Sequence, residues 1–479
     1  MKIALIPIDN RPVCYNLVKE IADIDDDLEL FLPDKKLLGS LKSVAEVDGI
    51  LDWFEGLENV DAIVVSLDTI AYGGLIPSRR SKNSTEEIKA RLDRFRDICG
   101  YKCGGRCSKV YAFSSIMRIS NNNVNEEEKE YWSEYGEKIF EYSYNFHKEG
   151  MEIEGVPQEI LSDYLATRQR NFQINKMYLD WVEQEVFDTL VFSKDDCAQY
   201  GLNVLESEIL ARIVKEKNLI DNKKSVFIKT GADEIPLTLL ARAVVDFNKE
   251  GDEDKAVAKI STKLLVPEYS YLISNYEDIS VESSAHAQIE LAGCEVCEEE
   301  DADLVLLMNN FEEHQGEIVM GVKTKPFMGK FDLPQKPYLI ADVRFANGSD
   351  NKFVGQLLKK KLGADFYGYS AWNTSANTLG SLICAAVVKF CAKKYNQEAF
   401  NKLQMVRFLD DWAYQANVRQ ALKLIHPKGS PRLDIRRLKT MMTPYEKKLS
   451  KVFGVKSKIK YGFPWRRFFE VSVVIESKS

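Results

Sequence analysis

The sequence predicts an α/β protein built around a mainly parallel sheet. Short runs rich in Val, Ile, Leu and Phe recur along the chain and are bounded by turn-forming residues, a pattern typical of buried parallel strands. Amphipathic helical patterns alternate with these runs. Alternation of strand and helix over such a length predicts parallel strands joined by right-handed crossovers.

The expected elements follow one another in this order. Strand patterns lie at residues 2–8, 28–33, 61–67, 109–115, 189–193, 225–229, 303–308, 337–342 and 365–371, with a weaker one near 260. Clear helices begin at Ser84, where Ser-x-x-Glu forms a capping box, and at Asn203. The interval 124–185 contains no strand pattern and predicts an insertion of two or three helices. After about residue 400 the chain is mostly helical and ends in a late strand.

Two architectures fit this order of elements. The strands can form a (β/α) barrel-like parallel sheet with the helical insertion and a C-terminal extension. Residues 1–250 and 251–395 are then two α/β parts of one catalytic body, and residues 396–479 form a helical/β extension. The alternative is two doubly wound α/β domains divided near residue 250.

Composition excludes several classes of protein. A net charge of −8 argues against a nucleic-acid partner, because backbone phosphates need clustered Lys and Arg. The N-terminal MKIALIPIDNRP predicts a first strand and not a signal peptide. Because no run approaches the roughly 18 apolar residues of a membrane span, we expect a cytoplasmic protein with no membrane partner. The sequence leaves the oligomeric state open.

The nine cysteines are an odd number and are expected to be reduced thiols in a cytoplasmic chain. A zinc site that combines CGYKCGGRC (Cys99, Cys103 and Cys107) with the CxxC of Cys294 and Cys297 is the alternative. Neither spacing is accompanied by a second CxxC or a pair of histidines. We therefore expect no metal.

Polar residues follow many of the strand patterns. Seven apolar runs end on a carboxylate or a carboxamide, namely Asp9, Asp68, Asp195 with Asp196, Asp233 with Glu234, Asn310, Asp342 and Asn373. Parallel sheets place ligand sites at the carboxyl ends of their strands. If the strands share one sheet, these side chains converge on a single rim.

The adjacent Asp195 and Asp196 are the preferred catalytic pair. They follow the run LVFSK directly, and two carboxylates so close cannot both ionise freely, which gives an acid beside a base. A helix cap plus a surface acid is the alternative. Glu234, in GADE before the helix IPLTLLARAVVDF, is the reserve catalytic acid, although Asp233 could simply cap that helix.

The remaining polar strand ends are expected to bind the substrate. The candidates are Asp9, Asn10 and Arg11 in DNRP, Asp68 and Tyr72 in SLDTIAYGG, Asp342 and Asn347 in ADVRFANGSDN, and Trp372, Asn373 and Asn377 in AWNTSAN. A Trp plane beside amides and carboxylates suits a sugar, which offers C–H faces and hydroxyl groups. Trp372 as an ordinary core residue is the alternative.

Missing motifs narrow the chemistry further. The chain has four histidines and none ends a strong strand pattern, so a Ser-His-Asp triad or a His-rich metal centre is poorly supported. HExxH, GxSxG and GxxxxGK[ST] do not occur in the sequence. We expect carboxylate chemistry without a cofactor.

Several motifs occur together in order: IPIDNRP, SLDTIAYGGL, KDDCAQYG, GADE, ANGSDN and AWNTSANTLG, with FPWRRFFE near the end. In these the chain resembles the bacterial family catalogued as domain of unknown function 4127, a resemblance that implies no particular reaction. Asp195 and Asp196 are also locally similar to the Asp-Asp pair of retaining N-acetylhexosaminidases on (β/α) barrels. That similarity implies that one Asp orients the substrate acetamido group and the other protonates the leaving oxygen.

These observations favour a carbohydrate-active enzyme, in particular a glycoside hydrolase acting on a small-molecule or oligosaccharide substrate. The first alternative is a divalent-metal-dependent hydrolase that uses Asp9, Asp68, Asp195 and Asp342 as oxygen ligands. The second alternative is a non-catalytic protein that binds a small polar ligand at the same strand ends.

Overall fold

The computed structural model covers the whole chain and describes all residues except 104–108, 152–153, 221–224, 250–256, 426–433 and 477–479. The chain divides into two compact units. The first unit contains Met1–Asn10, Glu29–Leu239 and Tyr276–Asp278, and the second contains Arg11–Leu28, Leu240–Asn275 and Ile279–Ser479. In the described residues no helix is long and apolar enough to cross a membrane.

The first unit is built on a six-stranded parallel sheet with the strand order β2-β1-β3-β4-β5-β6. Its strands are β1 Lys2–Ile6, β2 Glu29–Phe31, β3 Ala62–Ser66, β4 Lys109–Ile116, β5 Thr189–Lys194 and β6 Ser225–Thr230. The central strands β3 and β5 are buried along their whole length. This explains why they appear in the sequence as continuous apolar runs rather than alternating ones.

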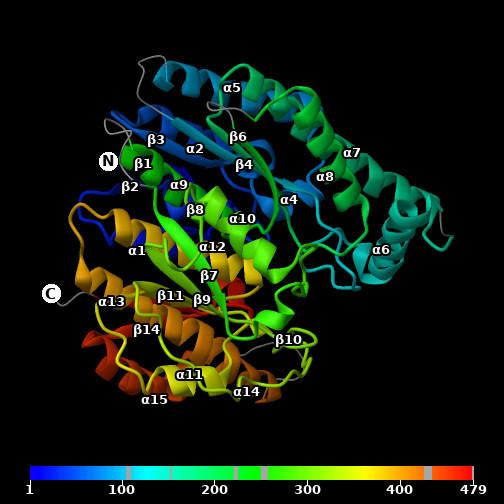
Figure 1. Cartoon of the computed structure of the whole chain (residues 1–479). Helices are drawn as coiled ribbons and strands as arrows, with labels where there is room; N and C mark the ends of the chain where they lie inside the picture. The colour runs from blue at the N-terminus through cyan, green and yellow to red at the C-terminus, as the bar shows by residue number, and fades with distance from the viewer. Residues whose placement is uncertain (104–108, 152–153, 221–224, 250–256, 426–433, 477–479) are drawn as a thin grey trace. The chain divides into compact units, whose positions relative to one another are not determined.

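Helices connect these strands (Figure 1). They are η1 Lys35–Leu37, α2 Val47–Gly56, α3 Leu67–Tyr72, α4 Leu75–Arg80, α5 Thr85–Cys103, α6 Trp132–Glu149, α7 Gln158–Glu183 and α8 Leu202–Glu216. Helices α6 and α7 form the predicted insertion, and α7 and α8 pack on β4 and β5.

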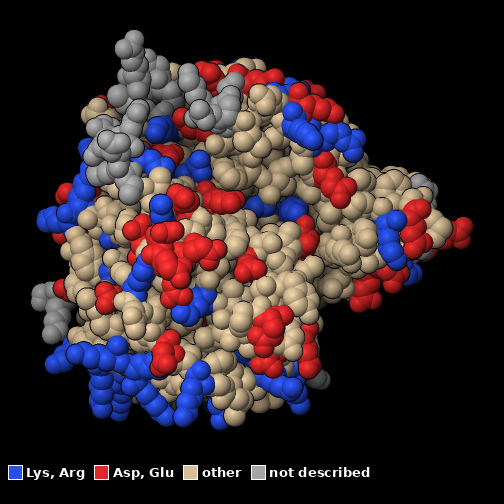
Figure 2. All heavy atoms as spheres, viewed as in Figure 1, with Lys and Arg blue, Asp and Glu red and all other residues tan. Residues whose placement is uncertain are grey.

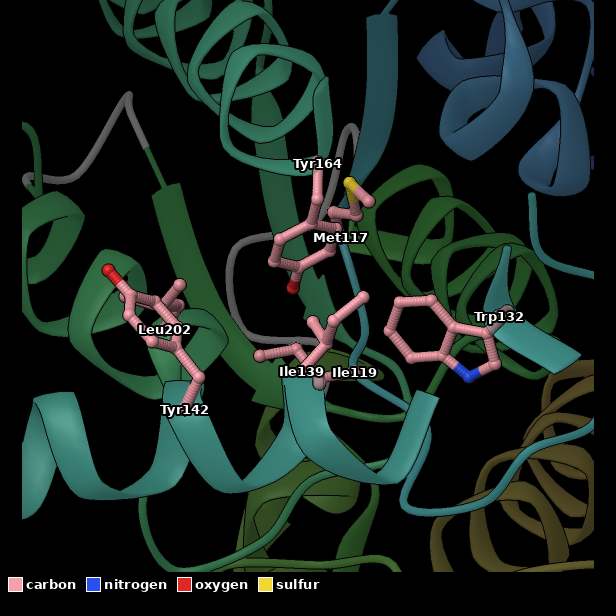
Figure 3. Packing of buried hydrophobic residues seen from close by; sticks show 7 residues of the cluster. All are labelled: Met117, Ile119, Trp132, Ile139, Tyr142, Tyr164 and Leu202. Atoms are coloured by element: carbon pink, nitrogen blue, oxygen red, sulfur yellow. The ribbon is translucent and has the colours of Figure 1, made fainter. Parts of the chain in front are cut away.

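A hydrophobic cluster joins the insertion to the sheet. It consists of Met117, Ile119, Trp132, Ile139, Tyr142, Tyr164 and Leu202. Figure 3 shows Ile139 and Tyr142 reaching into it from α6 and Tyr164 from α7, while Met117 and Ile119 come from the segment that follows β4. Burial of several large side chains here, each worth about 1.5–3 kcal/mol, fixes the insertion against the end of β4.

The second unit contains a five-stranded parallel sheet with the order β13-β11-β9-β7-β8. Its strands are β7 Lys259–Leu264, β8 Glu295–Val296, β9 Leu304–Asn309, β11 Tyr338–Asp342 and β13 Phe366–Ser370. Two small sheets accompany it, formed by β10 Gly316–Glu317 with β12 Phe345–Ala346 and by β14 Ile459–Gly462 with β15 Ser472–Ile475. The last pair is an antiparallel hairpin at the position of the expected late strand.

The helices of the second unit lie largely after β13. They are α1 Pro12–Ala22, η2 Pro267–Tyr269, α10 Val281–Leu291, α11 Asn351–Leu357, α12 Ser375–Cys391, α13 Gln397–Arg407, η3 Phe408–Val418, α14 Arg419–Ile425, α15 Ile435–Phe453 and η4 Pro464–Arg466. Helix α9, Ile235–Lys249, runs across the boundary between the units. The segment η3 is helical as predicted but has π-type hydrogen bonding, which is rare and concentrates at functional or strained positions.

Helix α15 is strongly amphipathic. Leu438, Met442, Leu449 and Phe453 face the unit's interior. The opposite face is exposed and basic, with Arg436, Arg437, Lys439, Lys447, Lys448 and Lys451. Figure 2 shows Lys and Arg side chains gathered along its lower edge, in the region where Figure 1 places α15. The basic residues therefore form the solvent-exposed face of an amphipathic helix whose other face is apolar.

The expected α/β class and its parallel pairing are confirmed. The idea that all seven polar strand ends share one rim requires a correction, because the strands belong to two different sheets. Asp9, Asp68, the Asp195 pair and Glu234 follow strands of the first sheet, whereas Asn310, Asp342 and Asn373 follow strands of the second. An apolar run in the sequence indicates that a strand is buried. It does not indicate which sheet the strand joins.

Candidate functional site

The Asp195 and Asp196 pair lies immediately after β5 in the first unit. Asp196 has a positive φ of 43°, a conformation that Asp tolerates better than most residues. The Asp195 side chain is 15% exposed and that of Asp196 is 34% exposed. The turn therefore leaves both carboxylates within reach of a ligand from solvent.

Two guanidinium groups hold this pair. Arg79 Nη2 donates to Asp195 Oδ2 at 3.2 Å, and Arg118 Nη1 donates to Asp196 Oδ2 at 2.8 Å. The same Arg118 nitrogen lies 3.6 Å from Asp195 Oδ2. Arg118 thus contacts both carboxylates of the pair, which fixes their orientation.

Two further acids complete the cluster. Glu128 Oε1 accepts hydrogen bonds from Arg79 Nη1 and Arg118 Nε, each at 3.0 Å. Glu127 Oε2 lies 2.9 Å from Arg118 Nη2. Four carboxylates therefore surround two guanidiniums, and this surplus of negative charge favours keeping a proton on one of them.

The hydrophobic cluster positions Arg118. Its neighbours Met117 and Ile119 are both buried in that cluster, and Figure 3 shows both side chains directed into it. In an extended segment, residues i and i+2 share a face and the residue between them points the other way. Packing of Met117 and Ile119 therefore directs Arg118 toward the carboxylates.

Helix α7 positions the second arginine. The carbonyl oxygen of Ser78, next to Arg79, accepts hydrogen bonds from Asn171 Nδ2 at 2.9 Å and from Arg170 Nη2 at 3.2 Å. On the same helix, Arg168 Nη2 donates to the carbonyl oxygen of Met117 at 2.7 Å. Helix α7 of the insertion thus anchors the backbone beside both Arg79 and Arg118. A search for polar residues at strand ends does not find these contacts.

One carboxyl of the pair has a raised pKa. Burial, together with the negative charge of Asp195, raises the pKa of Asp196 from 3.8 to about 7, although Arg118 and Arg79 oppose the shift. Asp195 instead forms its shortest ion pair with Arg79. This asymmetry is the arrangement of a proton donor beside a charged carboxylate that acid–base catalysis requires.

A second pair of acids in the same unit follows two strands that are not neighbours in the sheet. Carboxylate oxygens of Asp9, after β1, and Asp233, after β6, lie within 4.8 Å of each other. Between β1 and β6 stand β3, β4 and β5, so a flat sheet would separate the two strands by about 19 Å at the usual strand spacing. The strand ends therefore converge strongly.

Three other predicted site residues of the first unit are sealed inside it. Asp68 is 1% exposed, its Oδ2 accepts the Ser115 N–H at 2.8 Å, and burial raises its pKa to about 7. Glu234 is fully buried, its Oε2 accepts the Ala232 N–H at 3.0 Å, and burial likewise raises its pKa to about 7. Tyr72 is 2% exposed. All three therefore lie in the interior of the unit and not at its surface.

A short segment from far along the sequence joins the ends of β5 and β6. Asp278 accepts hydrogen bonds from Lys194 at the end of β5 and from Thr230 at the end of β6, the latter at 2.5 Å. The neighbouring Tyr276 carbonyl accepts the Cys197 N–H at 3.1 Å. Sequence reasoning missed Asp278 because it does not follow a strand.

Arg11 and Asn347 belong to the second unit and have structural partners there. Arg11 Nη1 lies 3.2 Å from Glu470 Oε1, and its guanidinium lies 5.1 Å from the centre of the Trp465 ring. Asn347 Nδ2 donates to Glu317 Oε1 at 2.6 Å. Asn10, in the first unit, is bound through its backbone N–H to the Gly39 carbonyl at 3.1 Å.

Asp342 is the centre of a fully buried network. Its Oδ2 accepts the Asp350 N–H at 2.8 Å and the Tyr369 hydroxyl at 3.2 Å, and its Oδ1 accepts Asn309 Nδ2 at 2.8 Å. Burial and the nearby Asp350 raise the pKa of Asp342 to about 7. The predicted role of Asp342 as a ligand beside Asp9, Asp68 and Asp195 needs correction, because it follows a strand of the other sheet.

The expected sugar platform is not exposed. Trp372 is 2% exposed, and its carbonyl oxygen accepts the Thr378 hydroxyl at 2.8 Å. The alternative of a core residue therefore describes Trp372. Asn373 is partly exposed and has a φ of 57°, and Asn377 is buried with no hydrogen-bond partner for Oδ1 in the described structure. Trp372 and Asn373 lie in the turn between β13 and α12 of the second unit, and Asn377 lies in the first turn of α12.

The sequence offered one signal for the missed arginines. Arg118 follows a strand, as the acids do, and a search for cations as well as acids at strand ends would have found it. Glu127 and Glu128 lie in the charged run NEEEKE, which is typical of a solvated loop. Seven cysteines of the described residues form no disulfide bond, namely Cys14, Cys99, Cys197, Cys294, Cys297, Cys384 and Cys391. Cys107 and the Cys103 side chain lie outside the described residues.

Comparison with known proteins places the chain in a family. The family model described as protein of unknown function (DUF4127) matches residues 3–474, and the chain therefore belongs to this family. No curated protein and no solved structure matches the chain. Any assignment of activity must therefore come from the residues themselves.

Proposed function

We propose that this chain is a cytoplasmic enzyme that uses Asp195 and Asp196 as an acid–base pair, and that its substrate is a glycoside with an acetamido group. The observation that carries the proposal is the partly exposed carboxylate pair held by Arg79 and Arg118 after β5. It combines a carboxyl with a raised pKa and a charged neighbour, which is the pairing that glycoside hydrolysis requires.

The proposed reaction assigns a role to each carboxyl. The acetamido oxygen of the substrate attacks the anomeric carbon, the bond to the leaving oxygen breaks, and Asp196 donates its proton to that oxygen. Asp195 accepts a hydrogen bond from the acetamido N–H and stabilises the positive charge that develops on the resulting oxazolinium ring. Water then opens this ring at the anomeric carbon, and its proton returns to Asp196.

The test uses single amide variants of the pair. Asp195→Asn and Asp196→Asn are assayed with a panel of aryl N-acetylglycosides, and each should lower kcat/KM at least about 100-fold. Asp301→Asn, at an exposed acid of the second unit, is the matched control and should retain full activity. Undiminished turnover in both pair variants would overturn the assignment.

A non-catalytic ligand-binding protein remains the competing class. It is distinguished by saturable binding of the glycosides followed by recovery of unchanged ligand after long incubation. Under the enzymatic proposal the Asp196→Asn variant should bind the same glycosides with nearly unchanged affinity, because it loses only the proton donor.

A divalent-metal hydrolase is the second candidate, favoured by the approach of Asp9 and Asp233 to within 4.8 Å. Carboxylate oxygens suit Mg²⁺ or Mn²⁺. In that case chelation should abolish turnover, Mn²⁺ should restore it, and Asp233→Asn should weaken the restoration. Activity that survives chelation would count against this candidate.

We also infer a barrel-like curl of the first sheet. The same approach of Asp9 to Asp233 supports it, because these residues follow strands that are separated by three others. Such a curl would bring the ends of β1 and β6 toward the rim that holds the Asp195 pair.

A further inference from the structure

The outer side of α15 presents a row of cations at the surface of the second unit. The helix buries Leu438, Met442, Leu449 and Phe453. On the side turned away from these residues it carries exposed Lys and Arg and no acid. We call its outermost cations the basic face, namely Arg436, Arg437, Lys447, Lys448 and Lys451. The one acid of the helix, Glu446, follows Met442 by four residues and precedes Leu449 by three, which places it toward the buried side.

The basic face has almost no carboxylate partners within the described residues. Arg437 Nε lies 4.0 Å from Asp434 Oδ2, and both side chains are largely exposed. The other four cations have no carboxylate oxygen within 4.0 Å in the described part of the chain. An exposed ion pair such as that of Arg437 contributes little. The positive charge of this face is therefore directed at solvent.

Local stability does not explain the row. Arg436 and Arg437 lie in the first turn of α15, where the positive end of the helix dipole disfavours cations. Lys447 and Lys451 are four residues apart on the helix and repel each other. The chain as a whole has a net charge of −8, so a face with cations and no acid departs from its average composition. A patch that the helix itself disfavours indicates an anionic partner outside the chain.

Exposed aliphatic side chains accompany the basic face. Leu424, at the end of α14, is 83% exposed, the highest value of any large hydrophobic residue in the described part of the chain. Its neighbour Ile425 is also exposed, as are Ile435 and Val452 of α15. Helices α14 and α15 both pack on η3, and Figure 1 shows both along its lower edge. This part of the unit therefore offers positive charge together with aliphatic groups.

We propose that the basic face docks the protein on an anionic lipid surface, with its ammonium and guanidinium groups at the lipid phosphates and Leu424 inserted among the lipids. From Arg436 to Lys451 the row is about 22 Å long at about 1.5 Å per residue, so it fits a surface with many anions better than one small anion. Basic clusters on amphipathic helices bind anionic lipids in this way. The contact lies on the surface of the membrane and requires no membrane-spanning helix.

A nucleic acid, the other extended polyanion, fits this surface less well. Proteins that hold single strands stack the bases on aromatic side chains, whereas the exposed large hydrophobic residues of α14 and α15 are all aliphatic. Aliphatic groups gain free energy by leaving water for lipid, and a phosphate backbone offers them no apolar surface. The combination of charge and aliphatic side chains therefore favours lipid.

The test measures co-sedimentation of the full chain with vesicles. Binding should be saturable on phosphatidylcholine vesicles that contain phosphatidylglycerol and absent on phosphatidylcholine alone. Raising NaCl from about 0.1 M to about 1 M should release the protein, because it shortens the Debye length from about 10 Å to about 3 Å. Equal binding to both kinds of vesicle would overturn the proposal, and so would binding to a DNA duplex without binding to the anionic vesicles.

Charge reversal assigns the binding to the basic face. The triple variant Lys447→Glu, Lys448→Glu and Lys451→Glu should weaken binding to the anionic vesicles at least about tenfold. A control makes the same change of charge at exposed lysines in and after α11, namely Lys352→Glu, Lys359→Glu and Lys361→Glu. The control should keep its affinity within about threefold of the unaltered chain. Equal weakening in the two triple variants would show that binding follows the net charge of the chain, which would overturn the assignment.

A single substitution separates lipid from other polyanions. Leu424→Ser should weaken binding to the anionic vesicles at least about threefold and leave its salt dependence unchanged, since it removes aliphatic surface and no charge. Unchanged affinity in this variant would show that the face recognises charge alone, and the lipid assignment would fall. Because Leu424 is exposed, this variant also keeps the comparison possible should the charge-reversed chain fail to fold.

Discussion

The carboxyl ends of the two parallel sheets carry similar residues but use them differently. After β5 of the first sheet, Asp195 and Asp196 remain 15% and 34% exposed and are held by side chains. After β11 of the second sheet, Asp342 is 0% exposed and is held by a backbone N–H and a hydroxyl. The difference teaches that a carboxylate held by guanidiniums at a surface can be offered to a ligand, whereas one held by uncharged donors inside the core is part of the fold.

Removal of the buried Asp342 carboxyl should have the largest effect on the free energy of unfolding. Asp342→Ala leaves the donors of Asp350, Tyr369 and Asn309 without an acceptor, so we expect a loss of about 3–5 kcal/mol in the free energy of unfolding. Asp196→Ala should cost less than about 1 kcal/mol, since Arg118 keeps other carboxylate partners. Denaturant unfolding measures both. Equal losses in the two variants would show that the two strand ends do not differ in this way.

A smaller loss should follow from Ile119→Ala. Removing this buried side chain from the cluster beside Arg118 should cost about 2–4 kcal/mol and loosen the orientation of Arg118. We therefore expect turnover of an aryl N-acetylglycoside to fall more than in Val226→Ala, a control at a buried position of strand β6 in the same sheet. Equal activity in the two variants would argue against a positioning role for the cluster.

Stability should fall as pH rises toward neutrality. Burial raises the pKa to about 7 in Glu20, Asp68, Asp196, Glu234, Asp342 and Asp411. Between about pH 4.5 and 7 the folded chain therefore binds more protons than the unfolded chain, and each net proton lowers the free energy of unfolding by about 1.4 kcal/mol per pH unit. Urea unfolding at several pH values in this window should show the decline, and stability that rises toward pH 7 would contradict it.

The smallest expected effect concerns the two adjacent carboxyls, Asp195 and Asp196. Because the charge of Asp195 raises the pKa of Asp196 and Arg118 lowers it, Asp195→Asn should lower that pKa and Arg118→Gln should raise it, each by roughly one unit. Carbon-13 NMR titration of the Asp196 carboxyl measures both shifts. Shifts of the same sign in the two variants would refute the proposed coupling.

Much of the fold could be predicted from the sequence, because strand burial is a local property of composition. The runs at 61–67 and 189–193 became β3 and β5, and the insertion expected at 124–185 contains α6 and α7. The short strands β8, β10 and β12 were missed, since two residues cannot show a periodicity. Their pairing depends on neighbours that are distant in the sequence.

The site was predictable in part. The Asp195 pair was identified as a polar strand end, and it lies partly exposed after β5. Arg79, Glu128 and Asp278 were not identified, because none of them directly follows a strand of the sheet. Trp372 was expected at a surface because of its polar neighbours, but its ring is buried in the core.

The sequence by itself determined where the strands are buried and which polar side chains stand at their ends. Both follow from local composition, because a buried parallel strand must be apolar and must stop where the chain meets water. Only the tertiary structure decided which sheet each strand joins, and therefore that Asp342 belongs with Tyr369 rather than with Asp195. It also decided which acids are held by arginines, since Arg79 and Arg118 are far from Asp195 and Asp196 along the chain and meet them only when it folds.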